Sequence, residues 1–133
     1  EGERKATVET FSSVLQNVVY SGYKRWQPYM IQAIIAGRSR DGSFKLFSFD
    51  PSAASVEDRY TATGSGMMFA LGIIQDNYKE GMSEVEAVEL AARSIYAAIR
   101  RDTATGEGIA IAIIDKNGYR RLNDRNISMI LNK

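Results

Sequence analysis

Residues 64–106 read GSGMMFALGIIQDNYKEGMSEVEAVELAARSIYAAIRRDTATG, and this stretch decides the fold. Its opening, Gly64-Ser65-Gly66, predicts the start of a helix, because serine and glycine favour the position before the first helical residue. Apolar side chains then recur at helical spacing, which predicts a helix over 66–79. Gly81 ends that helix, since glycine commonly follows a helix C-terminus.

A second helix is predicted directly afterwards, over 83–101. Ser83, with Glu86 three residues later, matches a capping box, in which each side chain accepts a hydrogen bond from the other residue's backbone amide. The predicted buried face of this helix consists of Val88, Ala91, Ala92, Ile95 and Ile99. The short turn at 81–83 predicts that the two helices pack antiparallel.

Antiparallel packing brings three polar residues to one end of the helix pair. Helices of these lengths extend about 21 and about 27 Å at a rise of about 1.5 Å per residue. The start of the first helix and the end of the second should therefore lie side by side. Ser65, Asp102 and Thr105 are expected to converge there and form the candidate catalytic site.

Each of these three residues also has an ordinary structural interpretation. Ser65 would suit a helix N-cap, and Thr105-Gly106 would suit the turn into the next strand. Asp102 opposes the macrodipole at a helix C-terminus and could be held there by an ion pair. The basic residues available for that pair are Arg100, Arg101 and Lys116.

The part of the chain before this helix pair predicts one helix and antiparallel strands. The predicted elements are a helix over 4–22, strands over 30–38, 44–49 and 59–63, and a loop over 52–58. Asp41-Gly42 is a hairpin turn signal that joins the first two strands. The apolar residues at helical spacing in the first helix are Val8, Phe11, Leu15, Val18 and Val19.

The part after the helix pair predicts a second hairpin followed by a tail. A buried strand is predicted over 108–114, and Asn117-Gly118 is a two-residue hairpin signal that precedes a returning strand. Residues 123–133 show no clear pattern and are predicted to be an irregular tail. This order of elements favours a layered α+β fold with antiparallel sheets. Without a repeat or a linker, residues 1–133 are predicted to form a single domain.

The residue types that are absent exclude several classes of function. The 133-residue chain has no histidine and no cysteine, so it can build no Ser-His-Asp triad, histidine or cysteine metal site, or disulfide. The net charge is +1, which does not indicate nucleic-acid or membrane binding. No apolar run approaches the roughly 20 residues of a membrane span. Any chemistry must use carboxylates, hydroxyls, lysines or backbone groups.

Two further motifs carry little functional signal. Gly64-Ser65-Gly66 is not followed by the third glycine of a dinucleotide-binding loop, because Phe69 occupies that position. Tyr23-Lys24-Arg25-Trp26 combines aromatic and basic side chains. After a helix, such a cluster is more often core or interface than a nucleic-acid contact.

Several segments, taken in order, resemble a known family. They are the hairpin over 36–50, the segment YTATGSG at 60–66, ALG at 70–72, YKEGMS at 78–83, EAVELA at 86–91, RDTATG at 101–106 and the strand at 108–114. Together they resemble a 20S proteasome β-type subunit, closest to the archaeal kind, over nearly the whole chain to about Leu122. The segment at 101–106 favours the β-type over the α-type subunit.

The resemblance implies a fold and a mechanism. The fold would be that of an N-terminal-nucleophile hydrolase, a four-layer αββα sandwich of antiparallel sheets, here incomplete on its N-terminal side. The activity would be that of a threonine endopeptidase, in which an N-terminal threonine hydroxyl attacks the peptide carbonyl and forms an acyl-enzyme. A lysine and an acidic residue would tune the nucleophile, and backbone amides would stabilise the oxyanion. This mechanism needs no histidine, cofactor or metal.

By the same resemblance, the three candidate residues support that nucleophile. Ser65 matches the serine near the threonine, and Asp102 matches the aspartate that helps to hold the centre. Thr105 stands where the family usually has serine, so it keeps the hydroxyl and adds a methyl group. The threonine itself is expected before Glu1, and the chain alone is expected to be inactive.

The resemblance also implies partners and a location. The partners would be other β-type and α-type subunits in stacked heptameric rings, an unfolded polypeptide substrate, and a regulatory ATPase acting through the α ring. Nucleic acid and membranes are not expected partners, and the expected location is cytoplasmic. Two alternatives stay open: a structural β-type subunit without a working nucleophile, and a small α+β binding module, for which the sequence shows no positive feature.

Overall fold

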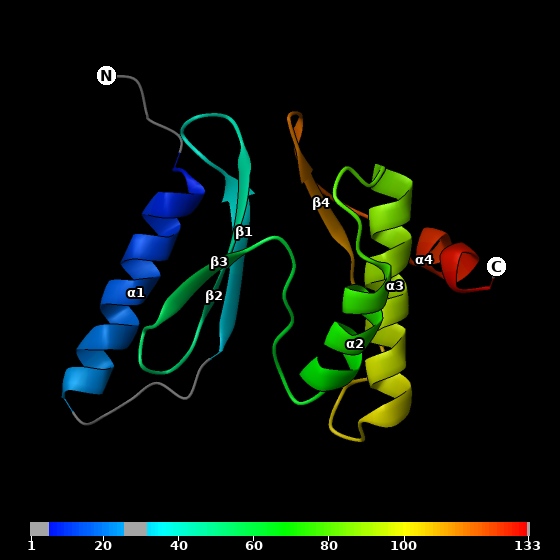
Figure 1. Ribbon diagram of the computed structural model, residues 1–133, viewed down its shortest axis with the longest axis horizontal. Helices are drawn as coiled ribbons and strands as arrows, with labels where there is room; N and C mark the ends of the chain where they lie inside the picture. The colour runs from blue at the N-terminus through cyan, green and yellow to red at the C-terminus, as the bar shows by residue number, and fades with distance from the viewer. Residues whose placement is uncertain (1–5, 26–31, 133) are drawn as a thin grey trace. The chain divides into compact units, whose positions relative to one another are not determined.

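Helices and antiparallel strands follow one another along the chain, and the computed structural model describes residues 6–25 and 32–132 (Figure 1). In chain order the elements are α1 (Val8–Lys24), β1 (Ala33–Arg38), β2 (Phe44–Phe49), β3 (Ser55–Asp58), α2 (Met67–Asn77), α3 (Glu84–Arg101), β4 (Ala112–Asp115), β5 (Gly118–Arg121) and α4 (Asp124–Leu131). All strand pairs are antiparallel, which confirms the predicted α+β class. The chain divides into two units, Glu1–Thr61 and Ala62–Lys133, and each is described by itself. The four-layer sandwich and the single domain stay predictions.

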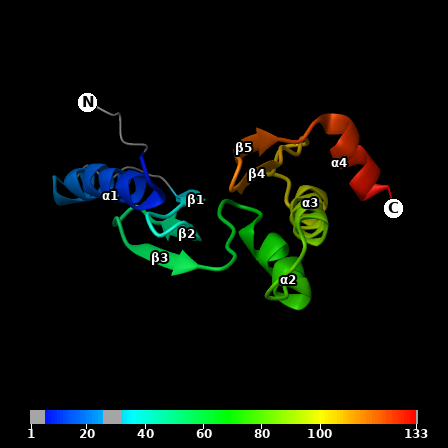
Figure 2. The same ribbon diagram turned by 90° about the horizontal axis from the view of Figure 1, so that it is seen from above.

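In the first unit, α1 packs against one face of the sheet β1-β2-β3 (Figures 1 and 2). The helix begins after Thr7, whose hydroxyl accepts a hydrogen bond from the backbone amide of Thr10 at 3.3 Å. The residues that α1 buries are Val8, Ser12, Val19 and Gly22. Gly37 of β1 allows the close approach of helix and sheet, because a Cβ there would lie only 3.1 Å from Val8 Cβ.

The predicted buried face of α1 is partly wrong. Val8 and Val19 are 4% and 1% exposed, whereas Phe11 and Val18 are 58% and 49% exposed. Apolar residues occupy a wide arc of this helix, and the sequence pattern does not say which part of the arc meets the sheet. The helix also continues past Gly22, where it was predicted to end. The predicted start at residues 4 and 5, and Trp26 of the aromatic cluster, lie outside the described residues.

The predicted hairpin is present between β1 and β2. The backbone amide of Ser39 donates to the carbonyl of Ser43 at 2.7 Å and closes the turn. Gly42 has a φ of +87°, a conformation that glycine adopts without strain. The turn predicted at Asp41-Gly42 is therefore confirmed, whereas residues 30 and 31 of the predicted strand lie outside the described residues.

The third strand lies earlier in the chain than predicted. Strand β3 falls within the segment 52–58, which was predicted to be a loop, and residues 59–63 do not form a strand. Asp50 closes a tight turn, because its Oδ1 accepts a hydrogen bond from the backbone amide of Ser52 at 2.8 Å. The chain therefore returns at once beside β2. All four residues of β3 are exposed, so no alternation of apolar and polar side chains marked this strand.

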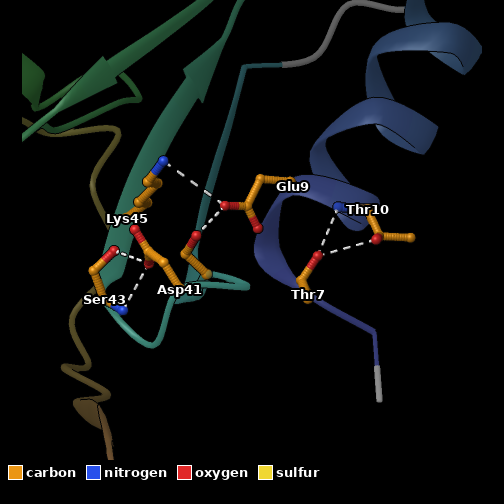
Figure 3. A network of polar contacts seen from close by, with 7 residues as sticks. Thr7, Glu9, Thr10, Asp41, Ser43 and Lys45 are labelled. Carbon is orange, nitrogen blue, oxygen red and sulfur yellow. Dashed lines mark hydrogen bonds and ion pairs between the residues drawn. The ribbon is translucent and has the colours of Figure 1, made fainter. Parts of the chain in front are cut away.

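A polar network joins the first turn of α1 to the β1–β2 hairpin (Figure 3). The hydroxyl of Ser39, which is buried, donates a hydrogen bond to Glu9 Oε1. Lys45 Nζ lies 3.8 Å from the same oxygen. The hydrogen bond from Ser39 is the main reason that the pKa of Glu9 is lowered, and the Lys45 charge acts in the same direction. Glu9 therefore favours the folded first unit while it is ionised.

We predict that Glu9→Gln reduces the loss of unfolding free energy that accompanies a fall in pH below neutral. Because the folded-state pKa of Glu9 is lowered, its contribution is present above the unfolded pKa of about 4.3 and is lost as the pH falls through the folded-state value. Urea unfolding between pH 7 and pH 3 should show a smaller loss for the variant than for the wild type. Glu57→Gln, on the exposed strand β3, is the control; an equal slope in Glu9→Gln and wild type would contradict the prediction.

In the second unit, α2 and α3 form the predicted antiparallel pair, and Figure 2 shows α3 between α2 on one side and the β4–β5 hairpin with α4 on the other. The predicted capping box is present, since Glu86 N donates to Ser83 Oγ at 3.2 Å and Ser83 N donates to Glu86 Oε2 at 2.9 Å. The residues that α3 buries are Leu90, Ala92, Ser94 and Ala98. The predicted buried face was therefore partly wrong, because α3 has neighbours on two sides.

The second hairpin is shifted by one residue from its predicted turn. Asp115 pairs with Gly118, so the two-residue loop is Lys116-Asn117 rather than Asn117-Gly118. The Asp115 carboxylate accepts a hydrogen bond from the backbone amide of Asn117 at 2.8 Å and fixes this loop. Gly118, with a φ of +108°, uses its conformational freedom at the first position of β5. Strand β4 is also shorter than the strand predicted over 108–114.

The prediction that residues 123–133 form an irregular tail is wrong. Asn123 caps the helix α4, because its side chain accepts a hydrogen bond from the backbone amide of Asn126 at 2.9 Å. Ile127 of α4 packs with Ala92 of α3 and with Ile111 in the core of this unit. A helix this short gives only a weak periodic signal in sequence, and it is stabilised by the packing of its buried face.

We predict that Ile127→Ala lowers the free energy of unfolding by about 2–5 kcal/mol, the cost of emptying a buried aliphatic site. Ile127 is 5% exposed, whereas Met129 on the same helix is 61% exposed. Met129→Ala is the matched control and should change stability by about 0.5 kcal/mol or less. Urea denaturation measures both variants. Equal and small effects would mean that α4 does not pack against the core.

Candidate functional site

The three predicted site residues meet at the shared end of α2 and α3. Ser65 lies just before α2, Asp102 is the C-cap of α3, and Thr105 follows in the next turn. The Ser65 hydroxyl donates a hydrogen bond to Asp102 Oδ2, and the Thr105 hydroxyl donates to the same oxygen at 2.6 Å. The predicted convergence is confirmed, while the catalytic role of the three residues stays a prediction.

Backbone groups hold Asp102 in place. Its amide donates to the carbonyl of Ala98 at 2.8 Å, and its carbonyl accepts from the amide of Thr105 at 3.3 Å. Its Oδ1 accepts from the amide of Ala104 at 3.4 Å, a long bond. The end of α3 and the following turn thus fix the direction of the carboxylate, and its Oδ2 receives the two hydroxyls.

The structure decides between the interpretations that the sequence left open. Ser65 is not the N-cap of α2, because that position belongs to Gly66, which makes no side-chain cap hydrogen bond. Asp102 is held by hydroxyl and amide groups. No ion pair joins it to the three basic residues proposed as partners, all of which lie in the described part of the chain. Thr105 does lie in a turn, and its hydroxyl also binds Asp102.

The hydrogen bonds give Asp102 a well-defined charge state. The hydroxyl of Ser65 contributes most to lowering the pKa of Asp102, and the hydroxyl of Thr105 contributes next. Partial removal from water opposes these effects but does not cancel them. Asp102 is therefore a carboxylate at neutral pH. Its two hydroxyl donors offset the unfavourable position of a negative charge at the C-terminus of α3.

The direction of these bonds determines what the site can offer to a third group. Each hydroxyl has a single proton, and both protons are used toward Asp102. Ser65 and Thr105 can therefore present only oxygen lone pairs to another molecule or segment. Two hydroxyl acceptors backed by a carboxylate suit a donor with positive charge, such as an ammonium group.

The same geometry argues against Ser65 as a nucleophile. An ionised carboxylate with a lowered pKa is a weak base and cannot remove the proton of a serine hydroxyl efficiently. The chain has no histidine to take that role. The cluster is thus suited to orient and stabilise a positively charged hydrogen-bond donor.

Metal-ligand groups and membrane-spanning helices are both absent from the described residues. No group of three or more carboxylate, histidine or cysteine side chains in residues 6–25 and 32–132 is placed to hold a metal ion. Over the same ranges, no helix has both the length and the apolar character that crossing a bilayer requires.

Two small residues next to the site have a steric role that the sequence did not predict. Gly66 follows Ser65 directly, and a Cβ on it would collide with Ala98 of α3 and with Thr105. Ala98 lies four residues before Asp102, on the face of α3 that meets the start of α2. In the sequence they are only a small residue at the start of one helix and a small residue near the end of another. Many small residues occupy such positions, so the sequence does not single these two out.

We predict that Ser65→Ala raises the pKa of Asp102 toward its ordinary value, because the carboxylate loses its strongest donor. Thr105→Val should raise it less, and Thr105→Ser should leave it close to wild type because the hydroxyl is kept. NMR titration of the Asp102 carboxyl carbon measures all three variants. An unchanged pKa in Ser65→Ala would show that the hydroxyl does not donate to Asp102 in solution.

Comparison with known proteins relates the sequence of this chain to one family. The family model described as Proteasome subunit matches residues 1–114. Proteasome subunit beta of Methanopyrus kandleri is 36% identical over 129 residues, which are 96% of this chain and 61% of that relative. The Ferroglobus placidus protein of the same name is 38% identical over 98% of this chain and 61% of its own length. Proteasome subunit beta 2 of Sulfolobus acidocaldarius is 42% identical over 89% of this chain and 56% of its own length.

Proposed function

The chain belongs to the proteasome subunit family, and from this membership we propose that the whole protein is a β-type subunit of the 20S core that acts as a threonine endopeptidase. Its substrates would be unfolded polypeptides. The observation that carries the proposal is the carboxylate of Asp102 with the hydroxyls of Ser65 and Thr105 directed at it. This chain spans about 61% of the length of the first two relatives, so the proposal concerns the complete subunit.

The cluster suits the free amino group of an N-terminal threonine. Ser65 Oγ and Thr105 Oγ1 would accept hydrogen bonds from that amine, and Asp102 would supply the negative charge behind them. An α-amino group has an ordinary pKa of about 7.7–8.0, far below that of a lysine side chain, and its neutral form carries the lone pair that acts as the base. The amine can then take the proton of the threonine hydroxyl and later pass it to the leaving amine.

The charge of the cluster would make that amine a better base. Proton transfer turns the neutral amine into an ammonium ion, and the acceptors around Asp102 favour the charged product. Holding the amine also directs its lone pair toward the threonine hydroxyl, which lowers the entropic cost of the attack. The amine thereby fills the role that histidine has in serine proteases.

We place the threonine, and the lysine and acidic residue that tune it, before Glu1 in the complete protein. The partners in this proposal are other β-type and α-type subunits in stacked heptameric rings, with a regulatory ATPase acting through the α ring, in the cytoplasm. The exposed apolar residues of α1, Phe11 and Val18 among them, are suited to contact a neighbouring subunit.

We predict that, in the complete assembled protein, Asp102→Asn lowers kcat for a fluorogenic peptide by about 100-fold or more, because the charge that supports the amine is removed. Asp76→Asn is the matched control, since Asp76 is exposed near the opposite end of α2, and it should keep wild-type turnover. The 133 residues alone should show no turnover.

Three results would contradict this proposal. Turnover by the 133 residues alone would show that the nucleophile lies within them. Wild-type turnover in Asp102→Asn would remove the cluster from the mechanism. An assembled wild-type protein without turnover, and without threonine at its mature N-terminus, would indicate the structural β-type subunit instead.

A further inference from the structure

We propose that Gly66 is a positioning residue: its lack of a side chain lets the start of α2 lie close enough to α3 for the Ser65 hydroxyl to reach Asp102 without displacing the Thr105 hydroxyl. This inference rests on the proposed function, since it concerns the same cluster. It adds a steric requirement at residue 66, which is separate from the charge and the hydrogen-bonding groups of the site.

The contacts around Gly66 are closer than a side chain would allow. A Cβ on this residue would lie 2.7 Å from Thr105 Oγ1 and 2.8 Å from Ala98 Cβ. It would also lie 3.6 Å from Asp102 Oδ2, an ordinary contact distance. Real Cβ atoms essentially never show separations below 3.0 Å, so a side chain at this position requires a movement of the site.

Space, and not backbone conformation, is the reason for glycine at this position. Gly66 has φ −88° and ψ 6°, which residues with side chains also adopt. Gly64, two residues earlier, shows the opposite case, with a φ of +98° and nothing within 4 Å of its would-be Cβ. Gly72, inside α2, also has free space around it, and its φ lies outside the positive region.

The two groups that would collide with a side chain at residue 66 differ in whether they can move away from it. Ala98 Cβ belongs to a buried residue of α3 and cannot rotate away, so the first turn of α2 would have to move. The Thr105 hydroxyl can rotate, but it would then lose its 2.6 Å hydrogen bond to Asp102. Moving α2 instead would draw Ser65 away from the carboxylate. Either response costs Asp102 one of its two hydroxyl donors.

The test is Gly66→Ala in the complete assembled protein, with Gly72→Ala as the matched control in the same helix. The inference predicts that kcat falls on the order of 10- to 100-fold in Gly66→Ala, while KM changes less than about twofold. Gly72→Ala should keep wild-type kcat and KM. A loss confined to kcat separates positioning of the cluster from damage to the substrate pocket.

A second variant and a second readout keep the test decisive if Gly66→Ala assembles poorly. Gly66→Ala/Ala98→Gly transfers one methyl group across the contact and should recover at least part of the lost assembly or kcat. In the 133-residue chain, NMR titration should show the pKa of Asp102 raised in Gly66→Ala and unchanged in Gly72→Ala.

The outcomes separate this inference from the proposed function. An inactive wild type with a raised Asp102 pKa in Gly66→Ala would reject the endopeptidase proposal and support the steric role. An active wild type with equal kcat in Gly66→Ala and Gly72→Ala, and with an unchanged Asp102 pKa, would overturn the role of Gly66. Absence of any recovery in the double variant would also count against it, since Ala98 is one of the two blocking groups.

Discussion

Two hydroxyl groups donate to one oxygen of the Asp102 carboxylate, and the proposed role of the site depends on this contact. It requires that α2 begins where α3 ends, which the antiparallel pairing of the two helices provides. It also requires that residue 66 has no side chain, because a Cβ there would collide with Ala98. The result is a fixed negative charge whose neighbouring oxygens can only accept hydrogen bonds.

The features that depend on local signals could be predicted from the sequence. Ser83 and Glu86 specify a capping box by their spacing alone, and the structure forms both of its hydrogen bonds. Asp41-Gly42 encodes a turn through the conformational freedom of glycine. The meeting of Ser65 with Asp102 follows from the lengths of the two helices and the short connection between them. The catalytic roles depended on the resemblance, and they stay proposals.

The features that could not be predicted depend on tertiary packing. Strand β3 has four exposed residues and is held by its pairing with β2, which the sequence pattern does not reveal. Helix α4 is short, and its place is set by Ile127 in the core with Ile111. The apolar arc of α1 contains more residues than the sheet covers, so the buried face predicted for this helix was too wide. The need for glycine at residue 66 arises from the distance between two helices, and the sequence alone does not give that distance.

The central claim is that this cluster holds an N-terminal amine, and an experimental structure of the complete assembled protein tests it most directly. The account predicts a threonine at the mature N-terminus, with its amine nitrogen within about 3.2 Å of Ser65 Oγ and Thr105 Oγ1. An N-terminus located elsewhere, with the two hydroxyls bound only to Asp102 and water, would contradict it.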